Sequence, residues 1–123
     1  TSFLESIMKY LVLTPLALLF FLTASIALAD ASAGKAVYGK VCASCHGTSG
    51  LGDGPVGVSL PPNMKPANLV KGDFKVVKDA NAIVELLTKG GPAFGLNPLM
   101  AAQPSLSDQE KKDVAEYVLS LKE

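Results

Sequence analysis

"VCASCHG", residues Val41 to Gly47, contains both cysteines and the only histidine of this chain of 123 residues. These three side chains occupy a window of five consecutive positions, from Cys42 to His46. Thiol and imidazole groups are among the side chains that most often bind metals or attach cofactors. The window therefore predicts a single site, around which the rest of the chain must fold.

Several kinds of site use paired cysteines, and the residues available distinguish them. A structural zinc site needs four Cys or His ligands, whereas this chain has three. A thioredoxin-like redox pair lies beside β-strands, and the sequence has no strand pattern. A disulfide that closes so small a loop would constrain the unfolded chain little. One covalently attached haem c accounts for all three residues, since Cys42 and Cys45 would form thioethers and His46 would bind the iron.

Three segments have the apolar spacing of an amphipathic helix. They are residues 33–45, which end at the cysteines, residues 79–91, which end in two glycines, and residues 107–121. Ser107 and Glu110 have the spacing of a capping box, so the last helix is expected to start there. The segments 47–68 and 90–104 are rich in Gly and Pro and are predicted to be long loops. Loops of this length in a small domain usually surround a ligand.

Charges balance over the part of the chain that follows residue 29. Lys9 and Glu5 are the only charged residues before it, so ten lysines face ten acidic residues from residue 30 onward. A neutral domain is unsuited to nucleic acid, which binds basic surfaces. Residues 30–123 are near the lower size limit of what a hydrophobic core alone can stabilise, so we expect a bound cofactor to support the fold.

The N-terminal segment has the features of a secretory signal. Lys9 precedes an apolar run that ends in Ala27-Leu28-Ala29, a small-x-small pattern typical of signal peptidase sites. We therefore expect residues 1–29 to be a Sec-type signal peptide, with residues 1–7 as an upstream extension. Residues 30–123 would then be a periplasmic domain without a membrane span. The alternative is an uncleaved N-terminal anchor, because the run is nearly as long as the ~20 residues that span a bilayer.

Beyond the attachment motif, residues 33–121 resemble the small class I c-type cytochromes of bacteria. The resemblance rests on four stretches: "GKAVYGKVCASCHG" (34–47), "GDGP" (52–55), "KPANL" (65–69) and "LSDQEKKDVAEYVLSL" (106–121). It implies an all-α class I cytochrome c fold, in which three main helices and long loops wrap one covalently bound haem. It also implies that a glycine of the first helix meets an aromatic residue of the last, here Gly34 against Tyr117.

A haem iron with one histidine still has a second axial position. No second histidine exists, and methionine is the next common ligand. Met64 lies in the polar, proline-bracketed turn "PPNMKP", whereas Met100 lies in the apolar loop "FGLNPLMAAQP" between two helices. Local context therefore favours Met100, and the resemblance agrees, although the family often has Pro where this chain has Ala101. The alternative is that Met100 fills space in the core beside an open iron.

The resemblance also implies a partner for the other ring nitrogen of His46. In similar proteins a proline carbonyl shortly after the motif accepts a hydrogen bond from the ligating imidazole. Pro55 in "GDGP" matches that position. We therefore expect the carbonyl of Pro55 to support the histidine on the cofactor's proximal side.

Ligation by His46 and Met100 would fill both axial positions, which leaves one-electron exchange as the chemistry of the iron. The sequence therefore predicts a periplasmic monohaem cytochrome that carries electrons between protein donors and acceptors and is not an enzyme. Four loop lysines either steer an acidic partner or are only solvated surface: Lys65, Lys71, Lys75 and Lys78. The alternatives are a haem subunit of a larger oxidoreductase, or a gas-binding sensor or peroxidase-like protein with an open distal position.

Overall fold

The structure is a computed structural model that describes residues 2–9, 28–72 and 74–123. Regular structure within these residues is entirely helical, which confirms the predicted all-α fold class. Residues 2–9 form a helix of their own. The others, in chain order, are α2 (Ala31–Val41), α3 (Ala43–His46), α4 (Pro55–Ser59), η2 (Pro62–Met64), α5 (Ala80–Lys89), η3 (Gly91–Phe94) and α6 (Asp108–Ser120).

Helices α2 and α3 carry the Cys-x-x-Cys-His motif. Asp30 caps the start of α2, because its side chain accepts a hydrogen bond from the backbone N–H of Ser32. At the other end, the N–H of Cys42 donates to the carbonyl of Tyr38 at 2.9 Å, and the chain then turns directly into α3. The prediction that the first helix ends at the cysteines is confirmed.

The two later helices begin and end where the sequence predicted. The Asp79 side chain caps α5, and Gly90 ends it with a φ of 81°, a conformation that glycine adopts without strain. At the start of α6, the Ser107 N–H donates to Glu110 Oε2 at 2.8 Å, and the Glu110 N–H donates to Ser107 Oγ at 3.2 Å. The Ser107 N–H most of all, and the Ser107 side chain after it, hold the pKa of the Glu110 carboxyl below its ordinary value.

Three short helices lie within segments that were predicted as loops: α4, η2 and η3. Each has a proline in its first turn, where the missing N–H costs no hydrogen bond. They are three to five residues long, which is too short for an apolar period to be visible in the sequence. The loop prediction is corrected to this extent.

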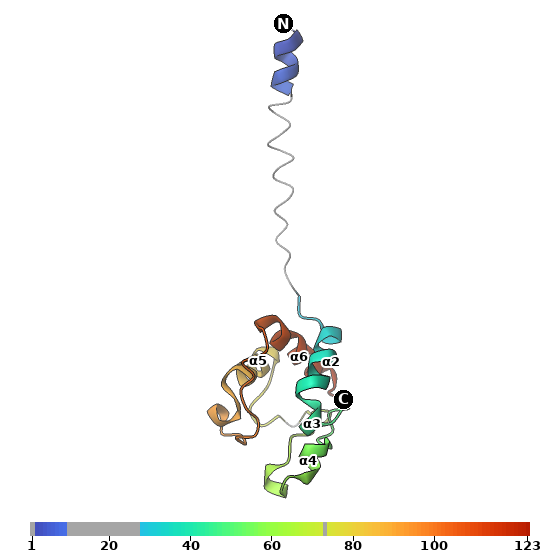
Figure 1. The fold of residues 1–123 in the computed structure, drawn as a ribbon, viewed down its shortest axis with the longest axis vertical. Coiled ribbons are helices and arrows are strands. Elements are labelled where there is room, and N and C mark those ends of the chain that lie inside the picture. Colours follow the sequence, from blue (N-terminus) through green and yellow to red (C-terminus); the bar gives the residue numbers. More distant parts are fainter. Residues whose placement is uncertain (1, 10–27, 73) are drawn as a thin grey trace.

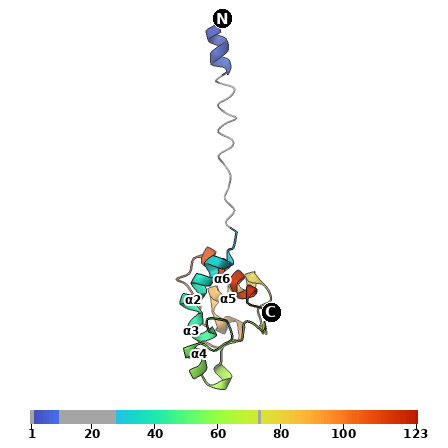
Figure 2. The same ribbon diagram turned by 90° about the vertical axis from the view of Figure 1, so that its right-hand side faces the viewer.

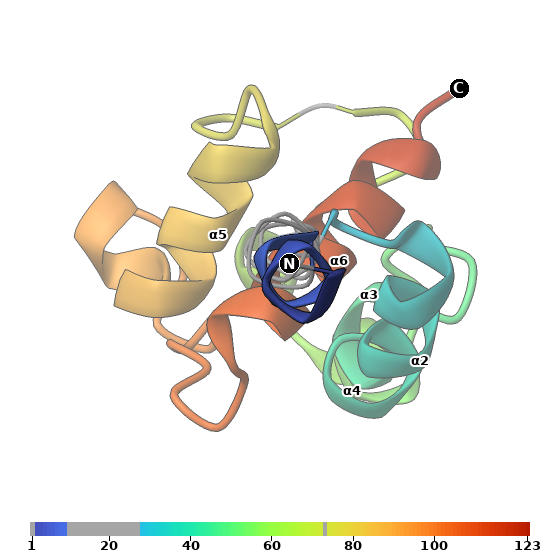
Figure 3. The same cartoon turned by 90° about the horizontal axis from the view of Figure 1, so that it is seen from above.

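Helix α6 lies between α2 and α5 and packs against both of them (Figure 3). The helices α2, α3 and α4 follow one another along one side of the domain (Figure 1), and the view turned by 90° shows the same succession (Figure 2). The buried core lies where these helices meet. Its apolar members are Tyr38, Ala43, Leu69, Val77, Ile83, Leu86, Leu87, Val114, Ala115 and Val118.

Helices α2 and α6 approach each other closely at Gly34. A β-carbon added to Gly34 would overlap the carbonyl of Asp113 and lie 2.9 Å from the backbone nitrogen of Val114. The glycine therefore lies against the backbone of α6, and its expected contact with Tyr117 stays a prediction. Tyr117 lies one turn further along and packs edge-on against Tyr38, with ring centroids 5.2 Å apart.

Most of the apolar N-terminal run, residues 10–27, lies outside the described residues, so the predicted signal peptide stays a prediction. Within the described ranges, none of the helices has the length and apolar character that a membrane crossing requires. The first residues of the predicted domain are anchored. The N–H of Asp30 donates to Asp113 Oδ1 at 2.8 Å, although the two residues are 83 positions apart.

Candidate functional site

The two cysteines lie on one side of a single helical turn. Cys45 follows Cys42 by three residues, and its N–H donates to the Cys42 carbonyl at 3.2 Å. Residues three apart in a helix share a face, so both thiols project to the same side. Both cysteines are free of disulfide bonds and partly buried. Burial raises the pKa of the Cys42 thiol to about 11, and the neighbouring Cys45 adds to the effect.

His46 is oriented by a backbone carbonyl from a distant segment. Its Nδ1 lies 3.2 Å from the carbonyl oxygen of Ala67, 21 positions along the chain. A carbonyl only accepts hydrogen bonds, so Nδ1 carries the proton. Burial lowers the pKa of the imidazole, against an opposing effect of the Ala67 hydrogen bond. A neutral imidazole with Nδ1 protonated has its lone pair on Nε2, the nitrogen that can bind a metal.

The acceptor of the His46 hydrogen bond is Ala67 and not Pro55, the residue expected from the family resemblance. Pro55 is instead the first residue of α4, a position that suits proline because no helical partner needs its N–H. Helix α4, which begins at Pro55, packs against α3. Ala67 belongs to the "KPANL" stretch, but a backbone carbonyl acceptor has no side-chain signature by which sequence could identify it.

The turn after His46 is held by a buried hydroxyl group. Tyr38 in α2 is 1% exposed, and its Oη donates to the carbonyl of Gly47 at 2.7 Å. Burial of this phenol raises its pKa above the ordinary value, so it stays a neutral donor. The N–H of Gly52 also donates to the carbonyl of His46 at 2.7 Å. Hydrogen bonds from two directions therefore fix the backbone on which the imidazole stands.

Met100 lies in the loop between α5 and α6 and has a firmly held backbone. Its N–H donates to the carbonyl of Asn97 at 3.0 Å, and its carbonyl accepts from the N–H of Gly91 at 2.6 Å. The Met100 side chain is partly buried and packs against the core. Met64, at the end of η2, is partly buried as well. The assignment of Met100 as an axial ligand stays a prediction.

The four lysines expected to guide a partner are all exposed. The Lys65 side chain is held against α4, because its Nζ donates a hydrogen bond to the carbonyl of Val58 at 2.9 Å. Lys71, Lys75 and Lys78 lie in the irregular segment that precedes α5.

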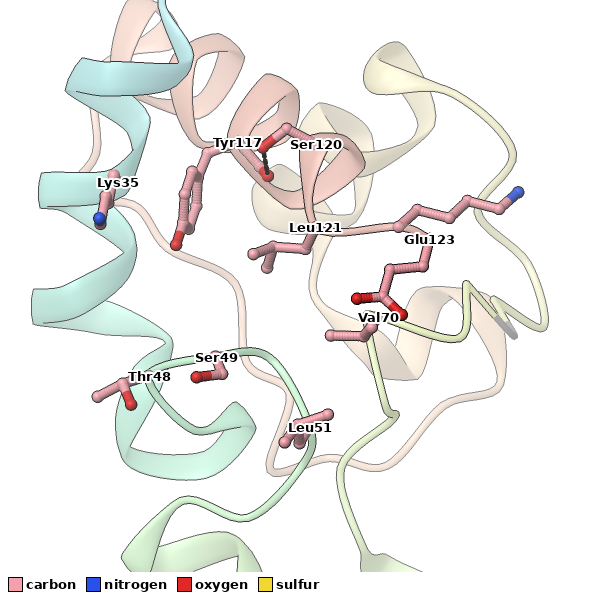
Figure 4. Close-up of a pocket in the computed structure, with 10 residues that line it drawn as sticks. Lys35, Thr48, Ser49, Leu51, Val70, Tyr117, Ser120, Leu121 and Glu123 are labelled. Carbon is pink, nitrogen blue, oxygen red and sulfur yellow. Dashed lines mark hydrogen bonds between the residues drawn. The ribbon is translucent and has the colours of Figure 1, made fainter.

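A separate pocket lies between α2, the loop after α3 and the C-terminus (Figure 4). Figure 4 shows the hydroxyl of Tyr117 directed toward the loop that carries Thr48 and Ser49. Its lining among the described residues is Lys35, Thr48, Ser49, Leu51, Val70, Tyr117, Ser120, Leu121, Lys122 and Glu123. The lining includes neither the cysteines nor His46, so this pocket is distinct from the candidate site.

Comparison with known proteins points to one family. Residues 31–122 match the family described as Cytochrome c. The chain is 36% identical over 95 residues to cytochrome c-554(547) of Halothiobacillus neapolitanus, which covers 76% of this chain and 98% of that protein. Its fold is similar to a chain of the reducing HAO-like protein complex of Kuenenia stuttgartiensis, with a TM-score of 0.62 and 29% identity. That match covers 73% of this chain but only 41% of the other.

Proposed function

This chain belongs to the cytochrome c family and is a monohaem c-type electron carrier, and we propose that His46 and Met100 are its two axial ligands. The observation that carries the assignment of His46 is the hydrogen bond from its Nδ1 to the Ala67 carbonyl, and the partly buried side chain of Met100, which packs against the core, supports the second ligand. The hydrogen bond leaves Nε2 as the metal-binding nitrogen and makes the imidazole a stronger donor.

The residues of the motif fit a covalently attached haem. Cys42 and Cys45 have free thiols on one face of a helical turn, as two thioether bonds to one macrocycle require. His46 follows directly and already has the protonation state that a ligand needs. We therefore propose that Cys42 and Cys45 hold the haem and that His46 approaches it from the same segment. When bound, the haem supplies one-electron exchange.

The residues around His46 have positional roles in this proposal. Ala67 and Tyr38 fix the orientation of His46 through the two backbone contacts described above. Met100 would close the distal position, so that small molecules cannot reach the metal. The proposal assigns no catalytic residue, because electron transfer needs a fixed environment and no proton transfer from the protein.

We further propose that the protein is exported to the periplasm after cleavage behind Ala29, and that it exchanges electrons with other proteins. The lysine-led apolar run and its Ala27-Leu28-Ala29 ending support export. The exposed lysines before α5 support docking to acidic partners.

A second candidate is a haem-carrying part of a larger redox assembly. The similarity to a chain of the HAO-like complex favours it, although this chain spans only 41% of that chain's length. The two candidates differ in the size of the purified particle. Light scattering of the exported protein at physiological salt would give the mass of a single chain for a free carrier, and a larger mass for an assembly.

The axial assignment is tested by carbon monoxide binding to two matched variants. Met100→Ala should keep its covalent haem, lose the weak red absorption of sulfur-ligated ferric haem, and bind carbon monoxide in the ferrous state. Its reduction potential should also fall, because methionine ligation raises the potential. Met64→Ala should leave all three properties unchanged. If Met64→Ala opens the iron, or if the wild type binds carbon monoxide readily, the assignment of Met100 is wrong.

A further inference from the structure

Asn97 connects the loop of Met100 with the loop of Met64. Its side-chain Nδ2 donates to the carbonyl of Met64 at 3.3 Å, across 33 positions of sequence. Its Oδ1 accepts from the N–H of Leu99 at 2.9 Å. Its backbone carbonyl accepts from the N–H of Met100 at 3.0 Å. One partly buried residue thus makes three hydrogen bonds around the predicted ligand.

The segment from Asn97 to Met100 is a four-residue turn closed by the bond between the first carbonyl and the last N–H. Asn favours the first position of such a turn and Pro the second, and Pro98 is present there. The Oδ1 contact adds the side-chain version of the same turn. The backbone direction at Met100 is therefore set by Asn97.

The other side of Met100 is fixed by the end of α5. The N–H of Gly91 donates to the Met100 carbonyl at 2.6 Å. The two segments touch so closely that a β-carbon on Gly91 would lie 2.7 Å from the carbonyl oxygen of Asn97 and 3.1 Å from the β-carbon of Met100. The turn is thus clamped between the α5 terminus on one side and the Met64 loop on the other.

We propose that Asn97 is a positioning residue for Met100, which rests on the proposed role of Met100 as a ligand. A neutral amide of this length offers both an acceptor for the Leu99 N–H and a donor for the Met64 carbonyl. An aspartate keeps the acceptor but loses the donor. By ordering the loop before the thioether binds, Asn97 lowers the entropic cost of ligation.

Displacement of the Met100 thioether by imidazole measures how strongly Asn97 favours ligation by Met100, because imidazole competes for the same axial position of the ferric protein. The loss of each hydrogen bond should raise the apparent imidazole affinity about fivefold. Asn97→Ala, which loses both side-chain bonds, should thus bind imidazole on the order of 10 to 30 times more tightly than the wild type. Asn97→Asp keeps the hydrogen bond to the Leu99 N–H and loses only the one to Met64, so it should bind imidazole about fivefold more tightly than the wild type.

The matched control is Asn81→Ala, which removes an exposed amide from the first turn of α5. It should change the imidazole affinity less than twofold. The Asn97 and Asn81 variants should keep the weak red absorption in the absence of imidazole, and denaturant unfolding should be recorded in parallel. If Asn97→Ala does not accumulate as folded holoprotein, Asn97→Asp carries the test.

An unchanged imidazole affinity in the Asn97 variants, together with a raised affinity in Met100→Ala, would overturn the positioning role. A lowered unfolding midpoint without a change in imidazole affinity would do the same, since it would show a structural role only. If Met100→Ala itself leaves imidazole and carbon monoxide binding unchanged, the axial assignment fails, and the inference about Asn97 fails with it. The two failures are therefore distinguishable.

Discussion

The carbonyl group of Asp113 in α6 lies directly over Gly34 in α2, with no room for a side chain between them. The helices meet backbone to backbone at this point. Beside the contact, Tyr38 and Val114 are each only 1% exposed. The close approach is what allows these two side chains to be fully buried, so the glycine controls the packing beneath the motif.

Replacement of this glycine should therefore destabilise the fold even when the new side chain is a single methyl group. Gly34→Ala should cost about 1 to 3 kcal/mol, because the neighbour is backbone and cannot rotate away. The melting temperature should fall by ~5 to 20 °C. Gly34→Leu should melt lower still, as measured by circular dichroism or calorimetry.

Gly39 provides the matched control, since it lies in the same helix and a β-carbon there would meet nothing within 4 Å. Gly39→Ala should stabilise the protein by about 0.5 to 1 kcal/mol through helix propensity alone. Equal stability of Gly34→Ala and the wild type would show that the helices do not meet at Gly34.

The capping box of α6 should make stability depend on acid pH. The folded state holds the pKa of Glu110 below its ordinary value, mainly through the Ser107 N–H. A lowered pKa in the folded state stabilises the protein above the unfolded value of about 4.3. This stabilisation is lost as the pH falls through the folded value. Glu110→Gln keeps the capping geometry but does not titrate.

Denaturant midpoints of the wild type and Glu110→Gln should therefore differ most near neutral pH, with the wild type more stable. The difference should shrink as the pH falls below about 4. A difference that stays constant between neutral and acid pH would contradict the assigned cause.

Removal of the proposed signal peptide would place a new charge beside Asp113. The backbone nitrogen of Asp30 that donates to Asp113 Oδ1 at 2.8 Å would become an ammonium group after cleavage. Hydrogen bonds to charged groups contribute about 1.5 to 3 kcal/mol, so Asp113→Asn should destabilise the exported protein by about that amount.

Mass spectrometry of the periplasmic protein should show a chain that begins at Asp30. Recovery of the full-length chain from membranes alone would contradict the prediction.

Electron transfer should depend on salt if the lysines before α5 guide docking. Reduction by an acidic protein donor should slow by roughly tenfold when salt screens the approach, for example between 0.01 and 0.15 M. Lys71→Glu and Lys75→Glu should slow the reaction at low salt, whereas the exposed Lys112→Glu on α6 should have a small effect. Stopped-flow rates that respond neither to salt nor to these substitutions would show that the lysines are only solvated surface.

The sequence by itself determined the chemistry of the site and the helices that carry it. Cys42, Cys45 and His46 lie within five consecutive positions, so their grouping does not depend on the fold. Helix limits followed from groups within a few residues of each other, as in the capping pair of Ser107 and Glu110. Such signals can be identified from a short segment of sequence alone, because capping and apolar periodicity act over one or two turns.

Only the tertiary structure decided which distant groups meet. The carbonyl that orients His46 belongs to Ala67, and the one that Asn97 reaches belongs to Met64. Likewise, the backbone that Gly34 meets in α6 is that of Asp113. Every residue carries a carbonyl group, so no residue type marks the one that is used, and the phase at which two helices cross is set by the packing of all their side chains at once.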